Sequence, residues 1–227
     1  MKRTLASSIV ICLMMMACDH SPENSPEQKS QAKQSSKPGE TNLESYGIKS
    51  STIPQGLSLG DHLPDITMKT DDDQMISLAD LYHEQPLVVI FYRGYWCPVC
   101  NRYLSTFAER AVELENAGAK ILAITPESYD NTEKTIQNTG IDFTVISDID
   151  GSVMTAFDVN FQVTDDYHQT IKENLNASIS ASNASNEAVL PIPATFVIDT
   201  NGVVIYRQFD PNYKNRASIE DILKYLP

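Results

Sequence analysis

One stretch near the middle of the chain constrains the fold more than any other feature. Leu87-Val88-Val89-Ile90-Phe91 is a continuous apolar run, which is typical of a strand buried on both faces. It leads into Trp96-Cys97-Pro98-Val99-Cys100, after which apolar residues recur at helical spacing from Val99 to Leu114. We therefore expect a strand, a turn that carries two cysteines, and a helix that ends near Gly118.

The rest of the chain from Gly56 onward alternates short apolar runs with amphipathic stretches, which predicts an α/β domain. We expect further strands at 120–125 and 143–146, with a helix at about 131–139 between them. Asn201-Gly202 is a hairpin turn signal between two apolar runs, and Ser218 is placed to cap a closing helix.

The polar stretch from Val163 to Val189 shows no convincing periodicity. We expect an insertion loop there, with a short helix near residues 167–174.

The N-terminal residues predict export. Residues 1–17 combine a basic start with an apolar run. The run is too short to span a bilayer, which takes about 20 residues, and this combination is typical of a signal peptide. Met15-Met16-Ala17-Cys18 resembles the lipobox of bacterial lipoproteins. The resemblance implies that Cys18 is lipidated and holds the protein on a membrane of the bacterial cell envelope, facing the periplasm or the cell exterior. The alternative is ordinary cleavage and release.

Residues 18–55 are rich in Ser, Pro, Gln, Glu and Lys and have few large apolar side chains. Such a composition cannot bury enough surface to offset chain entropy, so we expect a flexible tether. The folded domain is then expected at 56–227.

Charge excludes one class of partner. The net charge is −13, and removal of residues 1–17 takes away Lys2 and Arg3 and makes it −15. An acidic surface repels phosphate backbones, so nucleic-acid binding is not expected. The run Asp71-Asp72-Asp73 lacks the ligand spacing of a calcium loop, which favours a solvated turn.

Cysteine usage points to thiol redox chemistry. Of the four cysteines, Cys12 leaves with the signal peptide and Cys18 is expected to be lipidated, so Cys97 and Cys100 remain. The first turn of a helix stabilises a thiolate, and this spacing allows a disulfide. A structural disulfide closing so short a loop would stabilise the fold little. A metal site would need further ligands, which the spacing of the four histidines does not supply, so we expect neither a metal nor another cofactor.

Three segments resemble a known family. They are Phe91-Tyr92-Arg93-Gly94, the run from Pro191 to Asp199, and Asp210-Pro211-Asn212-Tyr213. Together they are similar to the AhpC/TSA group of the thioredoxin-like superfamily, over roughly Gly56 to Pro227. The resemblance implies a thioredoxin-like fold, in which a central mixed β-sheet is flanked by helices and preceded by an N-terminal β extension. It also implies a peroxide substrate, a thioredoxin-like or other dithiol protein as reductant, and a cis Pro193 facing the cysteine pair.

The same resemblance leaves the roles of the two thiols open. Aligned with typical peroxiredoxins, Cys100 takes the position of the attacking cysteine, whereas in thioredoxins the first cysteine attacks, which would be Cys97. Arg93 stands where those peroxiredoxins have a proline, and Pro193 stands where they have a catalytic arginine. We expect Arg93 either to stabilise a thiolate or to form a surface ion pair.

Further residues of the site are expected from the same comparison. Tyr95, Trp96 and Thr195 are expected to dock a substrate or partner, although plain packing would also explain the first two. Tyr213 and Arg216 fit the family pattern near the C-terminus without an evident role. The leading function is a thiol-dependent peroxidase, and the alternative is a thiol–disulfide oxidoreductase acting on exported proteins.

Overall fold

The structure is a computed structural model that describes residues 43–49, 53–69 and 74–227. The expected signal peptide, the lipidation site Cys18, most of the tether and the acidic run at 71–73 lie outside the described residues. Among the described helices, none combines the length and the apolar character needed to cross a bilayer.

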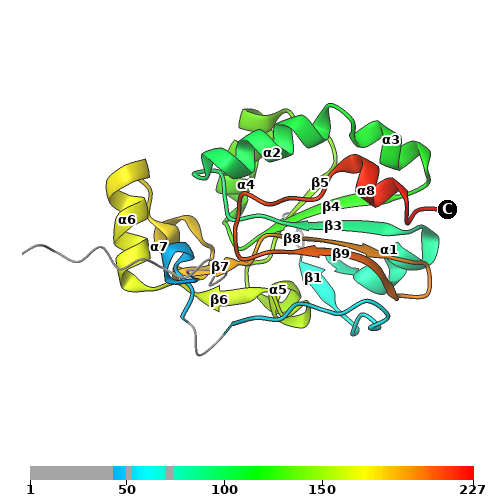
Figure 1. Ribbon diagram of the computed structural model, residues 1–227, viewed down its shortest axis with the longest axis horizontal. Coiled ribbons are helices and arrows are strands. Elements are labelled where there is room, and N and C mark those ends of the chain that lie inside the picture. Colours follow the sequence, from blue (N-terminus) through cyan, green and yellow to red (C-terminus); the bar gives the residue numbers. More distant parts are fainter. Residues whose placement is uncertain (1–42, 50–52, 70–73) are drawn as a thin grey trace, which may run out of the picture. The chain divides into compact units, whose positions relative to one another are not determined.

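A five-stranded mixed sheet forms the centre of the domain, in the strand order β5-β4-β3-β8-β9 (Figure 1). β4 runs parallel to both β3 and β5, whereas β8 runs antiparallel to β3 and to β9. The bounds are β3 Leu87–Phe91, β4 Lys120–Thr125, β5 Thr144–Ser147, β8 Ala194–Ile198 and β9 Val204–Phe209. The predicted fold class, a central mixed sheet flanked by helices, is confirmed.

Helices cover both faces of this sheet (Figure 1). Val88 and Ile90 of β3 pack into one core with residues of α2, α3 and α8, whereas Val89 and Phe91 pack into a second core with residues of α1 and α5. This alternation follows from the two-residue period of a strand and explains why every residue of β3 is apolar. The helices on the first face are α2 Pro98–Ala108, α3 Ala111–Asn116, α4 Tyr129–Thr139 and α8 Ile219–Leu223; those on the second are α1 Leu78–Glu84 and α5 Ser152–Ala156.

The prediction of one helix after the cysteines is wrong. The chain leaves the helix at Glu109 and Arg110, and α3 then begins at Ala111. At the break, the Arg110 guanidinium pairs with Glu113 and with Glu220 of α8, which is distant in sequence. Helical spacing persists in the sequence because Ala111 and Leu114 still face the same core.

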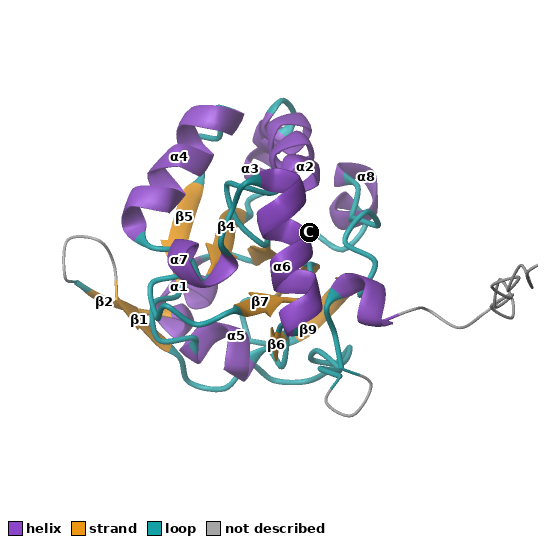
Figure 2. Cartoon of the chain, turned by 90° about the vertical axis from the view of Figure 1, so that its left-hand side faces the viewer, coloured by secondary structure: helices purple, strands orange, loops and turns teal. Residues whose placement is uncertain are grey.

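The short helix expected near residues 167–174 is present, but the rest of the stretch expected to be an insertion loop is more regular than its sequence suggests. It contains α6 Asp165–Leu175 and α7 Ile179–Ser182, and it is flanked by β6 Asn160–Gln162 and β7 Val189–Pro191, which pair antiparallel. α6 lies at one end of the sheet and stands in front in Figure 2. Only Tyr167 and Ile171 of α6 are buried, so its apolar face is too narrow to give a clear periodicity.

The packed part of the chain begins before Gly56, the expected boundary of the domain. Leu43–Tyr46 form a short 3-10 helix, η1, and Ile48 is only 1% exposed within the first core. The N–H of Thr164 donates to the carbonyl of Gly47 at 3.0 Å, and that of Gln55 donates to Asp158 Oδ2 at 2.8 Å. Further along, β1 Thr67–Lys69 and β2 Met75–Ser77 form a two-stranded antiparallel sheet, which matches the expected N-terminal β extension.

Candidate active site: a buried cysteine pair between two arginines

The two cysteines lie at the start of α2, just after the turn that connects it to β3. Cys97 is the N-cap of α2, and Pro98 is the first helical residue, where its missing N–H costs nothing. The Cys97 sulfur accepts the Cys100 backbone N–H at 3.2 Å, so a free donor of the first turn points at that sulfur. Both thiols are free and fully buried. The predicted succession of strand, turn and helix is confirmed.

Arg93 lies against the first sulfur. Its Nη2 donates to Cys97 Sγ at 3.0 Å, and its Nη1 donates to the hydroxyl of Tyr167. The side chain is buried, with 4% exposed, and the guanidinium lies 3.7 Å from the centre of the Tyr213 ring. Burial disfavours the charged guanidinium, but charge on Cys97 and Cys100 raises the pKa of Arg93 above its usual range. Arg93 is therefore placed as a partner of the thiol rather than as a surface arginine.

Arg216 lies against the second sulfur. Its Nη2 donates to Cys100 Sγ at 3.4 Å, and its Nη1 donates to the carbonyl of Phe91 at 3.4 Å. Its Nε donates to the carbonyl of Tyr213 at 2.8 Å, which fixes the guanidinium from the C-terminal side. Each sulfur thus has its own arginine.

The surroundings shift the pKa values of the two thiols in opposite directions. Burial raises the pKa of Cys100, but the hydrogen bond from the Cys97 thiol and the charges of Arg216 and Arg93 outweigh it and hold that pKa well below its usual value. Burial, the hydrogen bond to Cys100 and the charge on Cys100 raise the pKa of Cys97, and Arg93 only partly offsets them. Of the two thiols, Cys100 is therefore the more acidic, and the two titrate as a coupled pair.

The remaining predicted residues surround the pair in different ways. Pro193 comes just before β8, and because Ala194 pairs with Phe91, it lies beside the end of β3 that leads to the cysteines. Its expected cis bond stays a prediction. Trp96 and Thr195 are buried, with 7% and 1% exposed, so neither offers a docking surface in this conformation. Tyr95 is half-buried and stays a candidate for docking.

A buried carboxyl group escaped the sequence analysis. Glu127 is fully buried after β4; its Oε2 accepts the Tyr95 N–H at 2.8 Å, whereas its Oε1 has no hydrogen-bond partner in the described structure. Burial raises the pKa of this carboxyl from its ordinary 4.5 to about 8. Nothing in the sequence marks Glu127 or Tyr167, because only the tertiary fold brings them to the cysteines. Arg216 and Tyr213 did carry a signal, namely the family pattern around them.

Fold and site together define a class: a thioredoxin-fold protein whose helix N-terminus carries a buried, redox-competent dithiol. Among the described residues, no three His, Cys, Asp or Glu side chains are grouped as a metal site would require. The model of the AhpC/TSA family matches residues 59–207, and the chain belongs to that family.

Individual relatives agree with this assignment. Chloroplastic peroxiredoxin Q of Sedum lineare is 25% identical over 182 residues, which cover 79% of this chain and 83% of the relative. Among solved structures, reduced Prx3 of Vibrio vulnificus in complex with hydrogen peroxide is similar with a TM-score of 0.58 and 16% identity, over 74% of this chain and 97% of that one. A peroxiredoxin Q mutant of Xylella fastidiosa has a TM-score of 0.56 and 18% identity, over 75% and 95% of the two chains. At such identities the solved structures support the fold alone.

Proposed function

We propose that this chain reduces hydrogen peroxide or organic hydroperoxides, with Cys100 as the attacking thiol and Cys97 as the resolving thiol. Membership in the AhpC/TSA family and the peroxiredoxin relatives make it a thiol-dependent peroxidase. The observation that carries the division of roles is the separate arginine on each sulfur, with the pKa of Cys100 shifted below its usual value and that of Cys97 above it.

The first step is attack by the Cys100 thiolate on a peroxide oxygen. A sulfur–oxygen bond forms, the oxygen–oxygen bond breaks, and Cys100 becomes a sulfenic acid. The leaving oxygen takes up a proton and departs as an alcohol or as water. Arg216, whose Nη2 lies 3.4 Å from Cys100 Sγ, stabilises the thiolate and is placed beside the negative charge that develops on the peroxide.

The second step is attack by Cys97 on the sulfenic sulfur. The disulfide forms, and hydroxide leaves as water together with the proton that Cys97 releases. Arg93 at 3.0 Å and the Cys100 N–H at 3.2 Å both donate to Cys97 Sγ, so the thiolate that develops there is stabilised by two donors. Because both cysteines belong to the first turn of α2, the two steps need no long movement of the resolving cysteine.

An external dithiol protein of the thioredoxin type then returns the pair to the reduced state by thiol–disulfide exchange. Both sulfurs are fully buried in the described conformation. A protein thiol must approach a sulfur directly, so we expect the residues over Cys97 to move during this step.

Rapid mixing of the reduced protein with hydrogen peroxide and with an organic hydroperoxide tests the proposal. Trp96 is the only tryptophan of the chain and precedes Cys97, so its fluorescence reports the state of the pair. We expect a fast phase whose rate rises with peroxide concentration, followed by a phase that does not depend on it. A reaction no faster than that of a free thiol of the same pKa would refute peroxidase activity.

One observation favours a second function, thiol–disulfide exchange with exported proteins. Cys97 caps α2 and accepts two donors, which is the arrangement of an attacking thiol in a Cys-x-x-Cys motif. If exchange is the function, the variant Cys100→Ser should accumulate mixed disulfides with other proteins through Cys97. Absence of trapped partners together with intact peroxide turnover would leave the peroxidase alone.

We also propose that Cys18 is lipidated and that the domain is held at a membrane of a bacterial cell envelope. The support is the sequence Met15-Met16-Ala17-Cys18 after an apolar run. Expression of the full chain with a radiolabelled fatty acid should label the wild type and not Cys18→Ser. Equal labelling of the two proteins would contradict a lipid anchor at this residue.

A further inference from the structure

The Arg93 guanidinium is buried without a carboxylate partner. In the described structure its hydrogen bonds go to Cys97 Sγ and to the Tyr167 hydroxyl, and its Nε has no partner. A guanidinium taken out of water is costly unless other groups replace the lost hydration. Its position on Cys97 therefore depends on the few uncharged groups that surround it.

Aromatic side chains supply most of those surroundings. The guanidinium carbon lies 3.7 Å from the centre of the Tyr213 ring and 5.3 Å from that of the Trp96 ring, both within the range of cation–π attraction. Tyr167 adds a hydroxyl that accepts from Nη1. Two of these three residues come from outside the turn that carries the cysteines: Tyr167 from α6, and Tyr213 from the segment after β9.

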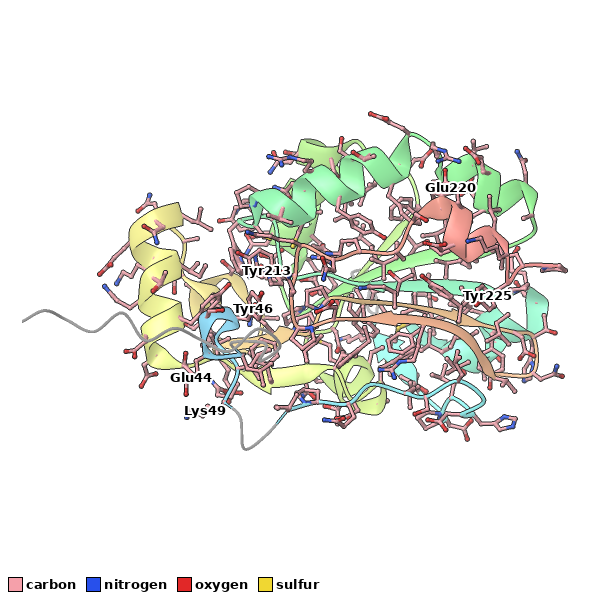
Figure 3. The ribbon with its side chains drawn as sticks, in the orientation of Figure 1. Glu44, Tyr46, Lys49, Tyr213, Glu220 and Tyr225 are labelled. Atoms are coloured by element: carbon pink, nitrogen blue, oxygen red, sulfur yellow. The ribbon has the colours of Figure 1, made fainter. Side chains whose placement is uncertain are left out.

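The segment Leu43–Ile48 contacts both Tyr167 and Tyr213. The Tyr46 ring meets the Tyr213 ring edge to face, with centres 5.7 Å apart and planes at 83°, and Figure 3 shows the two side chains close together. Gly47 has φ of +80° and lies so close to Tyr167 that a Cβ there would come within 2.7 Å of its ring. Its carbonyl also accepts the N–H of Thr164, the N-cap of α6.

We propose that Tyr167 and Tyr213 are positioning residues that hold Arg93 on the Cys97 sulfur, and that the segment Leu43–Ile48 holds these two tyrosines in turn. The acidity of the Cys97 thiol is then set partly by residues that precede the sheet in sequence. The consequence for catalysis, a change in the resolving step, rests on the proposed function, whereas the contact with Cys97 does not.

The test measures ionisation of Cys97 in the full chain carrying Cys100→Ser, by ultraviolet absorbance of the thiolate as a function of pH. Tyr167→Phe and Tyr213→Leu should each raise the pKa of the Cys97 thiol, so that its thiolate fraction at neutral pH falls at least threefold. Tyr46→Ala should act in the same direction with a smaller shift. Tyr225→Leu is the matched control, because the Tyr225 ring packs against Tyr206, away from Arg93, and its loss should leave the titration unchanged.

Repeating the titrations in the Arg93→Gln background separates positioning from a general loss of structure. If the tyrosines act through Arg93, Tyr167→Phe and Tyr213→Leu should have no further effect there. Equal shifts with and without Arg93, or no shift in either background, would overturn the proposal. No peroxide enters this measurement, so a failure of the peroxidase proposal would show only in the rapid-mixing experiment.

Discussion

Two buried thiols lie against a buried guanidinium group, that of Arg93, and a partly buried one, that of Arg216. Removing a cation from water without an anion nearby costs several kcal/mol, on the order estimated for buried ions in general. At Arg93 and Arg216 the described structure offers sulfur as a hydrogen-bond partner and no carboxylate. Ionisation of a thiol would give both arginines an anionic partner, and the charges of Arg216 and Arg93 accordingly lower the pKa of Cys100 despite its complete burial.

The role of Arg216 can be tested by removing its charge. Arg216→Gln should raise the pKa of the Cys100 thiol and slow the peroxide-dependent phase about tenfold, because loss of a charged donor beside the developing charge costs about 1.4 kcal/mol in the transition state. Stopped-flow fluorescence measures that phase. Arg102→Gln changes an exposed arginine on α2, the helix that carries Cys100; it is the control and should leave the rate unchanged. An unchanged first phase in Arg216→Gln would contradict the role given to this arginine.

Glu127 makes stability depend on pH. Its carboxyl titrates near pH 8 in the folded protein and near 4.5 otherwise, so the folded state binds more protons than the unfolded state between these values. The free energy of unfolding should therefore be highest below pH 4.5, as far as this group is concerned, and fall as pH rises to about 8. Glu127→Gln should remove that decline and be more stable than the wild type above pH 8, by about 2–4 kcal/mol.

Chemical denaturation at several pH values checks this expectation. Glu187→Gln changes an exposed carboxylate and should follow the wild type at each pH. The difference between wild type and Glu127→Gln cancels other titrating groups, such as Asp148, whose pKa burial also raises, to about 6. A constant difference across the range would mean that Glu127 is ionised throughout.

At the scale of elements, the turn between β3 and α2 controls where the sulfurs lie. Gly94 has φ of +151°, and a Cβ there would come within 2.4 Å of Glu127 Oε1 and 2.6 Å of Trp96 Nε1. Its carbonyl accepts the Cys97 N–H at 3.1 Å, which closes the turn. The absence of a side chain at Gly94 thus lets the carboxyl group and the indole pack against the turn.

Gly94→Ala should destabilise the domain by about 2–4 kcal/mol, because it combines a strained backbone with overlap against buried groups. Gly118→Ala is the matched comparison: φ is +81°, but nothing lies within 4 Å of the added Cβ, so only the backbone term of about 1 kcal/mol applies. Thermal and chemical unfolding measure both. Equal losses in the two variants would show that the contacts around Gly94 carry no energetic weight.

Elements could be predicted from sequence where their signals are local. The apolar run of β3, the Asn201-Gly202 hairpin and the Ser218 cap, which accepts the Asp221 N–H, all depend on neighbouring residues and agree with the structure. Periodicity does not show the break at Arg110, because Ala111 and Leu114 keep the apolar spacing of the helix before it. The sequence predicts α6 only in part, as a short helix near residues 167–174, because α6 buries few apolar residues.

At the scale of the whole molecule, the site is assembled from four distant parts of the chain. Leu43–Ile48, the turn around Cys97, α6 and the segment around Arg216 meet at one end of the sheet (Figure 1). The sequence predicted the cysteine pair and its thiol chemistry, because the apolar strand before the pair, the helical spacing after it and the family resemblance are all visible in the sequence. It left the nucleophile open, because the decision depends on which arginine reaches which sulfur.

The N-terminal limit of the packed domain gives a prediction at this scale. A chain beginning at residue 43 should unfold with the same midpoint as one that also retains residues 18–42. A chain beginning at residue 50 loses Ile48, which is 1% exposed, and should be less stable by about 2–4 kcal/mol. Equal stability of the two truncated chains would place the start of the packed domain at Gly56, as composition suggested.

The most direct test of the central claim compares the two single-cysteine variants in their reaction with hydrogen peroxide. Mass spectrometry of the reduced proteins, mixed with peroxide and quenched with a sulfenic-acid trap, follows the addition of one oxygen to each. We predict that Cys97→Ser forms a sulfenic acid at Cys100 at a rate close to the first phase of the wild type, whereas Cys100→Ser reacts only as a free thiol would. Rapid oxidation of Cys100→Ser at Cys97, with Cys97→Ser inert, would contradict the account.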